Sequence, residues 1–239
     1  MIDIHSHILP CIDDGARSML ESINILSNAS LNGVTDVILT PHYIDESIQV
    51  CNNKEKFDLL KKLREEVNKN NININLYLGN EVFISNNVID LLKNREIYTL
   101  NGSRYLLMEF SMGYYPNEID DVLDSLFKFG IIPVIAHPER YIYLYNNIDF
   151  FKYLVDRGCL LQCNIGSLFG EYGKSAKKMV KLLLKNNLVS FFASDIHRQN
   201  SSLYDYDIEG KLYKILKDKN KVKDLLINNQ LKVINDENL

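Results

Sequence analysis

The chain has 239 residues, of which 46% are hydrophobic and 24% charged, with a formal net charge of −4. A chain of this length buries roughly 70–75% of its unfolded surface on folding, which permits one sizeable core. The apolar content excludes intrinsic disorder, and no apolar run approaches the ~18 residues of a membrane helix. The acidic balance disfavours a nucleic-acid backbone as the main partner. We therefore expect neither nucleic-acid binding nor membrane insertion.

The N-terminal residues and the cysteines indicate where the protein works. Residues Met1–His5 lack the basic and apolar regions of a signal peptide. The four cysteines show no C-x-x-C spacing, so we expect free thiols in a reducing compartment. Both features predict a cytoplasmic protein. No linker or low-complexity tract divides the sequence, and a single domain over residues 1–239 is expected.

Short apolar runs of strand type alternate with longer amphipathic stretches along the chain. The expected strands are Ile2–His5, Val34–Thr40, Ile74–Leu78, Tyr105–Phe110, Pro133–Ala136, Leu160–Ile165 and Val189–Ser194. The expected helices are Ser18–Asn32, Lys54–Asn70, Glu118–Phe129, Asp149–Arg157, Ser175–Lys185 and Lys211–Leu216. The first helix opens with a capping box of Ser18 and Glu21, followed by apolar residues at helical spacing.

This alternation predicts an α/β fold in which parallel strands are joined by crossover helices. A closed (β/α) barrel with seven strands, one short of the usual eight, fits best. An open doubly wound sheet is the alternative. Both architectures bind ligands at the carboxyl ends of their strands.

All five histidines lie at or just beyond the carboxyl end of an expected strand. Several carboxylates share this location, including two in a loop after the first strand. The histidines are His5, His7, His42, His137 and His197, and the acids are Asp13, Asp14, Glu81, Glu109 and Asp195. Residues two apart in a strand point to the same side, so His5 and His7 project together, as do Asp195 and His197.

Imidazole and carboxylate donors without a thiolate suit Mn²⁺, Fe²⁺ or Zn²⁺ in a hydrolytic site. Eight or nine donors exceed the needs of one ion, so two or three ions are implied, an arrangement suited to phosphoryl transfer. The structural alternative is that these are separately paired buried residues. Burying the Glu109 carboxylate without a cation would cost several kcal/mol, which favours the metal interpretation.

The sequence allows two other interpretations. Cys11 and Arg17 have the C-x5-R spacing of cysteine-based tyrosine phosphatases. The intervening Asp13 and Asp14 place two negative charges where a phosphate should bind, so we expect Cys11 not to be a nucleophile. The other alternative is a non-enzymatic role, in which the metal cluster serves structure or partner binding.

The motifs resemble a known family over residues 1 to about 197. They are Met1–His7, Asp13–Gly15, Thr40–His42, Gly79–Glu81, Met108–Ser111, His137–Tyr141, Ser167–Gly173 and Ala193–His197. In this order they are similar to the PHP (polymerase and histidinol phosphatase) superfamily. Within it they most resemble the bacterial CpsB/YwqE-type metal-dependent protein-tyrosine phosphatases, which are linked to capsule and exopolysaccharide production.

The resemblance implies a distorted seven-stranded TIM-like barrel with two to three metal ions, manganese being expected and iron or zinc the alternatives. It implies three ligand groups, with Glu81 bridging the first two: His5, His7, Glu81 and Asp195; Glu81, Glu109 and His137; and Asp14, His42 and His197. Asp13 stays an alternative to Asp14. Arg140 matches the phosphate-binding arginine of the family. The family's further arginine, several residues beyond Asp-x-His, is missing, so either Arg198 takes that role or substrate binding is weaker.

The implied reaction is hydrolysis of phosphotyrosine on proteins, in which a metal-activated hydroxide attacks phosphorus while Arg140 holds the equatorial oxygens. A bacterial tyrosine autokinase is the expected partner, and capsule or exopolysaccharide synthesis the expected process. The alternative is another PHP phosphoesterase acting on histidinol phosphate or a small molecule, with the same metal site and different substrate loops.

Overall fold

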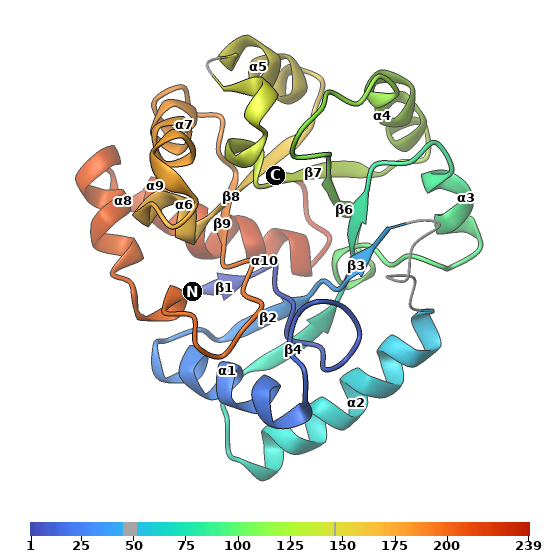
Figure 1. The fold of residues 1–239 in the computed structure, drawn as a ribbon, viewed down its shortest axis with the longest axis vertical. Helices are drawn as coiled ribbons and strands as arrows, with labels where there is room; N and C mark the ends of the chain where they lie inside the picture. The colour runs from blue at the N-terminus through green and yellow to red at the C-terminus, as the bar shows by residue number, and fades with distance from the viewer. Residues whose placement is uncertain (45–51, 146) are drawn as a thin grey trace.

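Parallel strands surrounded by helices make up the fold (Figure 1). The structure is a computed structural model that describes residues 1–44, 52–145 and 147–239. One sheet has the order β1-β2-β4, with β1 at Ile2–Asp3, β2 at Asp36–Leu39 and β4 at Asn75–Leu78. The other has the order β3-β5-β6-β7-β8-β9, and its strands are β3 His42–Tyr43, β5 Glu81–Phe83, β6 Tyr105–Glu109, β7 Ile132–Ala136, β8 Leu160–Asn164 and β9 Phe191–Ala193.

The two sheets follow one another along the chain. Strands β3 and β5 continue β2 and β4 after short interruptions, at residues 40–41 and 79–80. Pro41 at the first interruption has no N–H to donate to a ladder. On the other side, Asp195 N–H donates to His5 O and His7 N–H to Ile196 O, both at 2.9 Å, which joins the chain after β9 to the chain after β1. The predicted TIM-like arrangement of parallel strands is therefore confirmed, as two linked sheets rather than one continuous ladder.

The predicted helices are found with small shifts at their ends, and further short helices join them. The helices are α1 Met19–Leu31, α2 Asn53–Lys69, α3 Val88–Lys93, α4 Ile119–Lys128, α5 Ile148–Asp156, α6 Ile165–Phe169, α7 Gly173–Lys185, α8 Ile208–Leu216, α9 Lys219–Lys223 and α10 Asn229–Ile234. Ser18 caps α1 by accepting a hydrogen bond from Glu21 N–H, as the capping box predicts. No helix in the described ranges is both long and apolar enough to cross a membrane.

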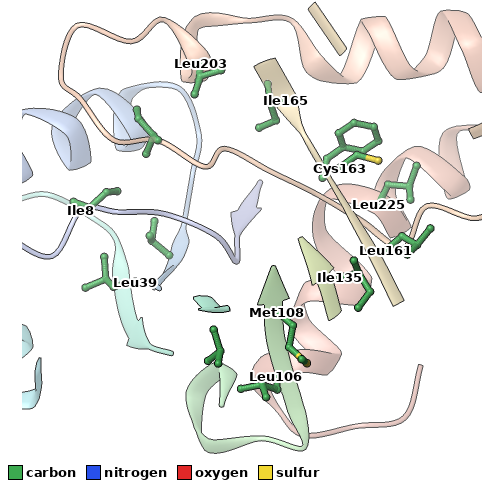
Figure 2. Close-up of a cluster of buried hydrophobic side chains, with 14 of the residues drawn as sticks. Ile8, Leu39, Leu106, Met108, Ile135, Leu161, Cys163, Ile165, Leu203 and Leu225 are labelled. Atoms are coloured by element: carbon green, nitrogen blue, oxygen red, sulfur yellow. The ribbon is translucent and has the colours of Figure 1, made fainter. Parts of the chain in front are cut away.

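Two groups of buried apolar side chains hold the strands in place. The larger group lies between strands and helices and includes Leu106, Met108 and Ile135 (Figure 2). The smaller group includes Leu107 and Val134, which alternate with members of the larger group along β6 and β7. Both faces of the strands are thus covered by apolar side chains, which explains their continuous apolar sequences.

The C-terminal helices close the amino-terminal end of the barrel. Val233 of α10 belongs to the smaller buried group together with Ile2 and Phe191, near the start of their strands. The Tyr105 hydroxyl donates to Glu237 O at 2.6 Å, which holds the last residues against the start of β6. This leaves the opposite, carboxyl end of the strands as the open mouth of the barrel.

Candidate metal centre

The mouth gathers the histidines and acids that the sequence places after separate strands. His5 and His7 follow β1, Asp195 and His197 follow β9, and His137 follows β7, while His42, Glu81 and Glu109 lie in β3, β5 and β6. Their side chains form three overlapping groups whose potential ligand atoms lie within 4.8 Å of one another: His5, His7, Glu81 and Asp195; His42, Glu81 and Glu109; and His7, Asp14, His42 and His197.

The first group is buried and has tetrahedral dimensions. Nε2 of His5 and Nε2 of His7 are 3.2 Å apart. Each of these nitrogens is 3.1 Å from Glu81 Oε2 and 3.4 Å from Asp195 Oδ1. Ligand atoms of a tetrahedral ion with bonds of ~2.0–2.1 Å lie about 3.3 Å apart. The four side chains therefore fit a transition-metal ion without rearrangement.

Glu81 is the acid that the first two groups share. Its Oε2 is buried and has no hydrogen-bond partner among the described residues, although imidazole nitrogens of His5, His7 and His42 lie 3.1–3.2 Å away. Its Oε1 lies 2.8 Å from His137 Nε2. A buried carboxylate oxygen that faces several imidazole nitrogens is stabilised either by protons on those nitrogens or by a cation bound between them. The convergence of three imidazoles on one buried carboxylate oxygen is the strongest sign that the site is built for metal.

The second group contains a histidine that the resemblance assigns elsewhere. His42 Nδ1 lies 3.2 Å from both Glu81 Oε2 and Glu109 Oε1, and the same ring reaches Asp14 Oδ1 with Nε2 at 3.6 Å. His137, implied as the partner of Glu109, has its Nε2 3.9 Å from Glu109 Oε2. Glu81, Glu109 and His137 are therefore neighbours, and His42 lies between the second and third groups.

The structure separates the two adjacent aspartates. Asp14 Oδ1 is 3.5 Å from His197 Nε2, in the third group. Asp13 Oδ2 instead accepts from His7 Nδ1 at 2.8 Å, and it also accepts from His42 N–H at 3.1 Å. A carboxylate on the outer nitrogen of a histidine fixes the ring and makes it a better ligand. The geometry thus makes Asp14 the candidate ligand and Asp13 a positioning residue.

Two buried amides that the sequence analysis did not single out complete the surroundings. Gln162 Oε1 lies 2.7 Å from His5 Nδ1, and Asn164 Nδ2 donates to Asp195 Oδ2 at 2.6 Å. The two amides are joined by a 2.9 Å hydrogen bond. Their spacing in the run Leu160–Asn164 was an available signal, because polar residues two apart at the end of a buried strand point the same way.

Two of the candidate ligands have a strained backbone conformation. His137 has φ of 35° and Asp195 has φ of 55°, both in the left-handed region that side chains larger than hydrogen avoid. His137 directly follows the last residue of β7, and Asp195 lies two residues beyond the end of β9, so each residue sits in the turn that leads its strand into the cluster. Such outliers persist only where the surrounding contacts enforce them, and they accumulate at functional sites.

A guanidinium lies at the edge of the cluster. Arg140 Nη1 donates to Asp195 Oδ2 at 3.0 Å. Its Cζ lies 4.3 Å from the centre of the Tyr172 ring, in a cation–π stack. Arg198, the other arginine of interest, donates from Nη1 to Gly15 O, which ties it to the loop that carries Asp14.

The cluster controls the protonation of its own members. Burial alone would lower the pKa of His5, but the Glu81 and Asp195 carboxylates raise it to about 9. Burial likewise opposes the charged form of His7, and Asp13 raises its pKa well above the ordinary value. Without metal, these imidazoles therefore carry protons at neutral pH and neutralise the buried acids.

Metal binding to the metal-free protein should release protons at pH 7. Ligand imidazoles must be neutral, whereas the pKa of His5 lies near 9, so metal displaces its proton. Between pH 7 and 9 the apparent affinity should rise about tenfold per pH unit for each proton released. Calorimetric titration with Mn²⁺ in buffers of different ionisation enthalpy measures this release. A binding enthalpy that is the same in every buffer would contradict it.

The cysteine of the C-x5-R segment is not part of this cluster. The Cys11 thiol is exposed and donates to Arg17 O at 3.0 Å. The loop supplies Asp13 and Asp14 to the histidines instead. Cys159 and Cys163 are free and buried, and Cys51 lies outside the described residues.

Fold and site together define a TIM-barrel-like protein with a candidate polynuclear metal centre at the carboxyl ends of its strands. Residues 1–235 match the family model described as capsular polysaccharide synthesis, CpsB/CapC. The chain belongs to this family.

Individual relatives agree with this assignment. The tyrosine-protein phosphatase CpsB of Streptococcus pneumoniae is 35% identical over 99% of both chains. The putative tyrosine-protein phosphatase CapC of Staphylococcus aureus is 37% identical over 82% of this chain and 77% of its own length. A crystal structure from a study of Bacillus subtilis YwqE and S. pneumoniae CpsB, described as unique metal-dependent tyrosine phosphatases, matches with a TM-score of 0.87. It is 31% identical and covers all of this chain and 96% of the other.

Proposed function

We propose that this chain is a metal-dependent phosphatase that hydrolyses phosphotyrosine on proteins. The observation that carries the proposal is the unpartnered Oε2 of Glu81, buried among three imidazoles beside Arg140. The membership of the chain in the CpsB/CapC family supports the same reaction, because the relatives named above are tyrosine-protein phosphatases. We also propose that residues 1–239 act as one domain, which the family match over residues 1–235 supports.

We propose that the cluster holds two to three ions, Mn²⁺ first, with Fe²⁺ or Zn²⁺ as alternatives. The proposed ligands are His5, His7, Asp14, His42, Glu81, Glu109, His137, Asp195 and His197. Bound divalent ions would supply a water of lowered pKa, near ~7, and would polarise the phosphoryl oxygens. The mixed imidazole and carboxylate set is consistent with these metals and lacks the thiolates of closed structural zinc sites.

The cationic part of the phosphate site belongs to Arg140. Its guanidinium is held by Asp195 on one edge and by the Tyr172 ring on one face, which leaves it oriented toward the cluster. A planar fork of donors suits two phosphoryl oxygens at once and stabilises the charge that they carry in the transition state. The departing tyrosinate has a parent pKa near 10 and needs only partial protonation. Arg198 is proposed as a second anion contact from the Asp14 loop.

The proposed substrate is a tyrosine-phosphorylated protein, with a bacterial tyrosine autokinase as partner and capsule or exopolysaccharide synthesis as the regulated process. The description of the matched family as capsular polysaccharide synthesis supports this process. A cytoplasmic location belongs to the same proposal and is supported by the free state of the described cysteines.

The proposal is tested by elemental analysis of the purified protein together with hydrolysis assays before and after chelation. We expect two to three transition-metal ions per chain, turnover of a phosphotyrosyl peptide that chelation abolishes, and best recovery with Mn²⁺. Histidinol phosphate serves as the competing substrate in the same assays. Faster turnover of histidinol phosphate would reassign the substrate, and peptide hydrolysis that survives chelation would overturn the metal mechanism.

Replacing Cys11 should leave phosphatase activity intact. The Cys11→Ser variant keeps a donor of similar size for the Arg17 carbonyl, and the thiol is exposed and belongs to none of the three ligand groups. We expect kcat and KM within about twofold of the parent enzyme, since exposed substitutions are usually near neutral. Steady-state kinetics with an aryl phosphate measures this, and an inactive variant would revive the cysteine mechanism.

A further inference from the structure

Helix α7 carries a row of lysines with no acid on the same helix. Its residues Gly173–Lys185 include five lysines and neither aspartate nor glutamate, in a chain of net charge −4. Four of these lysines are exposed and lie at helical spacing on one face: Lys174, Lys178, Lys181 and Lys185. We call these four residues the α7 basic stripe. The opposite face of α7, which includes Met179, Val180 and Leu183, packs into the core.

The stripe lacks the neutralising partners that three lysines on other helices have. Lys69, Lys93 and Lys152 each pair with an acid three residues earlier on the same helix. Among the ion pairs of the described ranges, none involves a residue of the stripe. Glu171, just before α7, accepts instead from the Tyr206 hydroxyl at 2.7 Å. The stripe therefore presents an uncompensated positive potential to solvent.

The stripe begins at the mouth of the barrel. Tyr172, the residue before α7, stacks on Arg140, which in turn binds Asp195 of the candidate metal centre. Lys174 follows two residues later, and α7, which carries the stripe, lies on the outside of the barrel (Figure 1). Lys178 also lines a small hollow with Tyr145, Ser175, Met179 and Leu182. A chain bound at Arg140 can thus continue directly onto the stripe.

The chemistry of the surface favours an acidic peptide over other anionic partners. A membrane-binding helix needs apolar side chains to insert beside its lysines, and none of the large apolar side chains exposed in the described part of the chain lies on α7. Single-stranded nucleic acid binds with aromatic side chains on which bases stack, and the stripe presents only lysines. Carboxylates of an extended peptide require nothing more than spaced cations.

Resting on the proposed function, we propose that the α7 basic stripe binds an acidic segment of the protein substrate next to its phosphotyrosine. Lys174 and Lys185 are separated by about 16 Å along the helix, at ~1.5 Å per residue. An extended peptide covers this distance in about five residues. The stripe thereby selects phosphotyrosines that have several acidic residues nearby in the sequence. These acids lie in the part of the peptide that extends from the mouth across α7.

The test compares two phosphotyrosyl peptides of equal length, one with aspartates and one with serines flanking the phosphotyrosine. In the parent enzyme, we expect kcat/KM to be higher for the acidic peptide than for the serine peptide. In the double variant Lys174→Glu/Lys178→Glu, this ratio should fall about tenfold, mainly through a higher KM for the acidic peptide. Each exposed charge pair contributes little binding free energy, but the contributions of several pairs add together. The preference should also weaken as salt rises. The matched control Lys61→Glu/Lys62→Glu, on the opposite side of the ring at α2, should keep the parental ratio (Figure 1).

Binding measurements separate this inference from the proposed activity. Fluorescence anisotropy of a labelled acidic peptide, without turnover, should show weaker binding to the α7 variant than to the α2 control. If the parent enzyme hydrolyses neither peptide, the proposed function fails, while the anisotropy comparison still decides the inference. An acidic preference that survives in the α7 variant overturns the inference. So does lysine-dependent pelleting with anionic phosphatidylserine vesicles in the absence of any peptide preference.

Discussion

Glu81→Gln should lower kcat/KM for a phosphotyrosyl peptide roughly a thousandfold and reduce the metal content of the purified protein. Loss of an outer partner of a metal ligand typically costs 10–100-fold, and Glu81 contributes both carboxylate oxygens to the centre of the cluster. The amide keeps the shape of the side chain but removes the negative charge that faces the histidines. Kinetics with elemental analysis measures both effects.

The control for this variant is Glu65→Gln, which removes an equal charge from the exposed face of α2. It should retain both metal and activity. If Glu81→Gln bound a full complement of ions and turned over at the parental rate, Glu81 would not be a shared ligand. The interpretation of its orphaned oxygen as a metal contact would then be wrong.

Arg140→Ala should lower kcat/KM by about two to three orders of magnitude, the usual effect of removing one donor aimed at developing charge. Arg140→Lys should recover only part of this loss, because an ammonium cannot donate to two oxygens in a fixed plane or stack in the same way on Tyr172. Steady-state kinetics of all three proteins with an aryl phosphate, at saturating Mn²⁺, gives the separate changes in kcat and KM.

A second arginine provides the matched control. Arg157 of the α5 end also contacts an aromatic ring and pairs with Asp120, but it lies on the surface away from the mouth. Arg157→Ala should therefore leave the kinetics unchanged within about twofold, as exposed ion pairs contribute little. Equal losses in the two alanine variants would mean that Arg140 acts through stability rather than through the phosphate.

The barrel and the location of the site were predictable from local patterns. Apolar runs such as Tyr105–Phe110 are short and continuous, which is typical of strands covered on both faces, and amphipathic stretches such as Lys54–Asn70 lie between them. Ligands bind at the carboxyl ends of parallel strands, and this general rule predicts that His5, His42 and Glu81 lie together at one end of the barrel. Each of these inferences depends only on neighbouring residues and on a general rule of topology.

The details that escaped prediction depend on contacts between distant segments. Which nitrogen of His42 faces which acid follows from the register that places it beside Glu81 in the β3–β5 pair. The separate roles of Asp13 and Asp14 depend on the direction of the loop relative to His7. The last helices carry weak patterns of their own, and only the start of the barrel shows what Val233 packs against. Sequence spacing holds no information on any of these relations.

Helix α10 lies at one end of the strands and the histidines lie at the other. The two ends of the molecule are therefore under different selective pressures. Side chains at the sealed end, such as Val233 and Phe191, are constrained by how they pack in the buried apolar group. Side chains at the mouth crowd buried charges together, as at Glu81 and Asp195, which folding alone would not favour. Relatives can therefore diverge at the sealed end by compensating apolar exchanges, and thermal tolerance can change during evolution without altering the chemistry at the mouth.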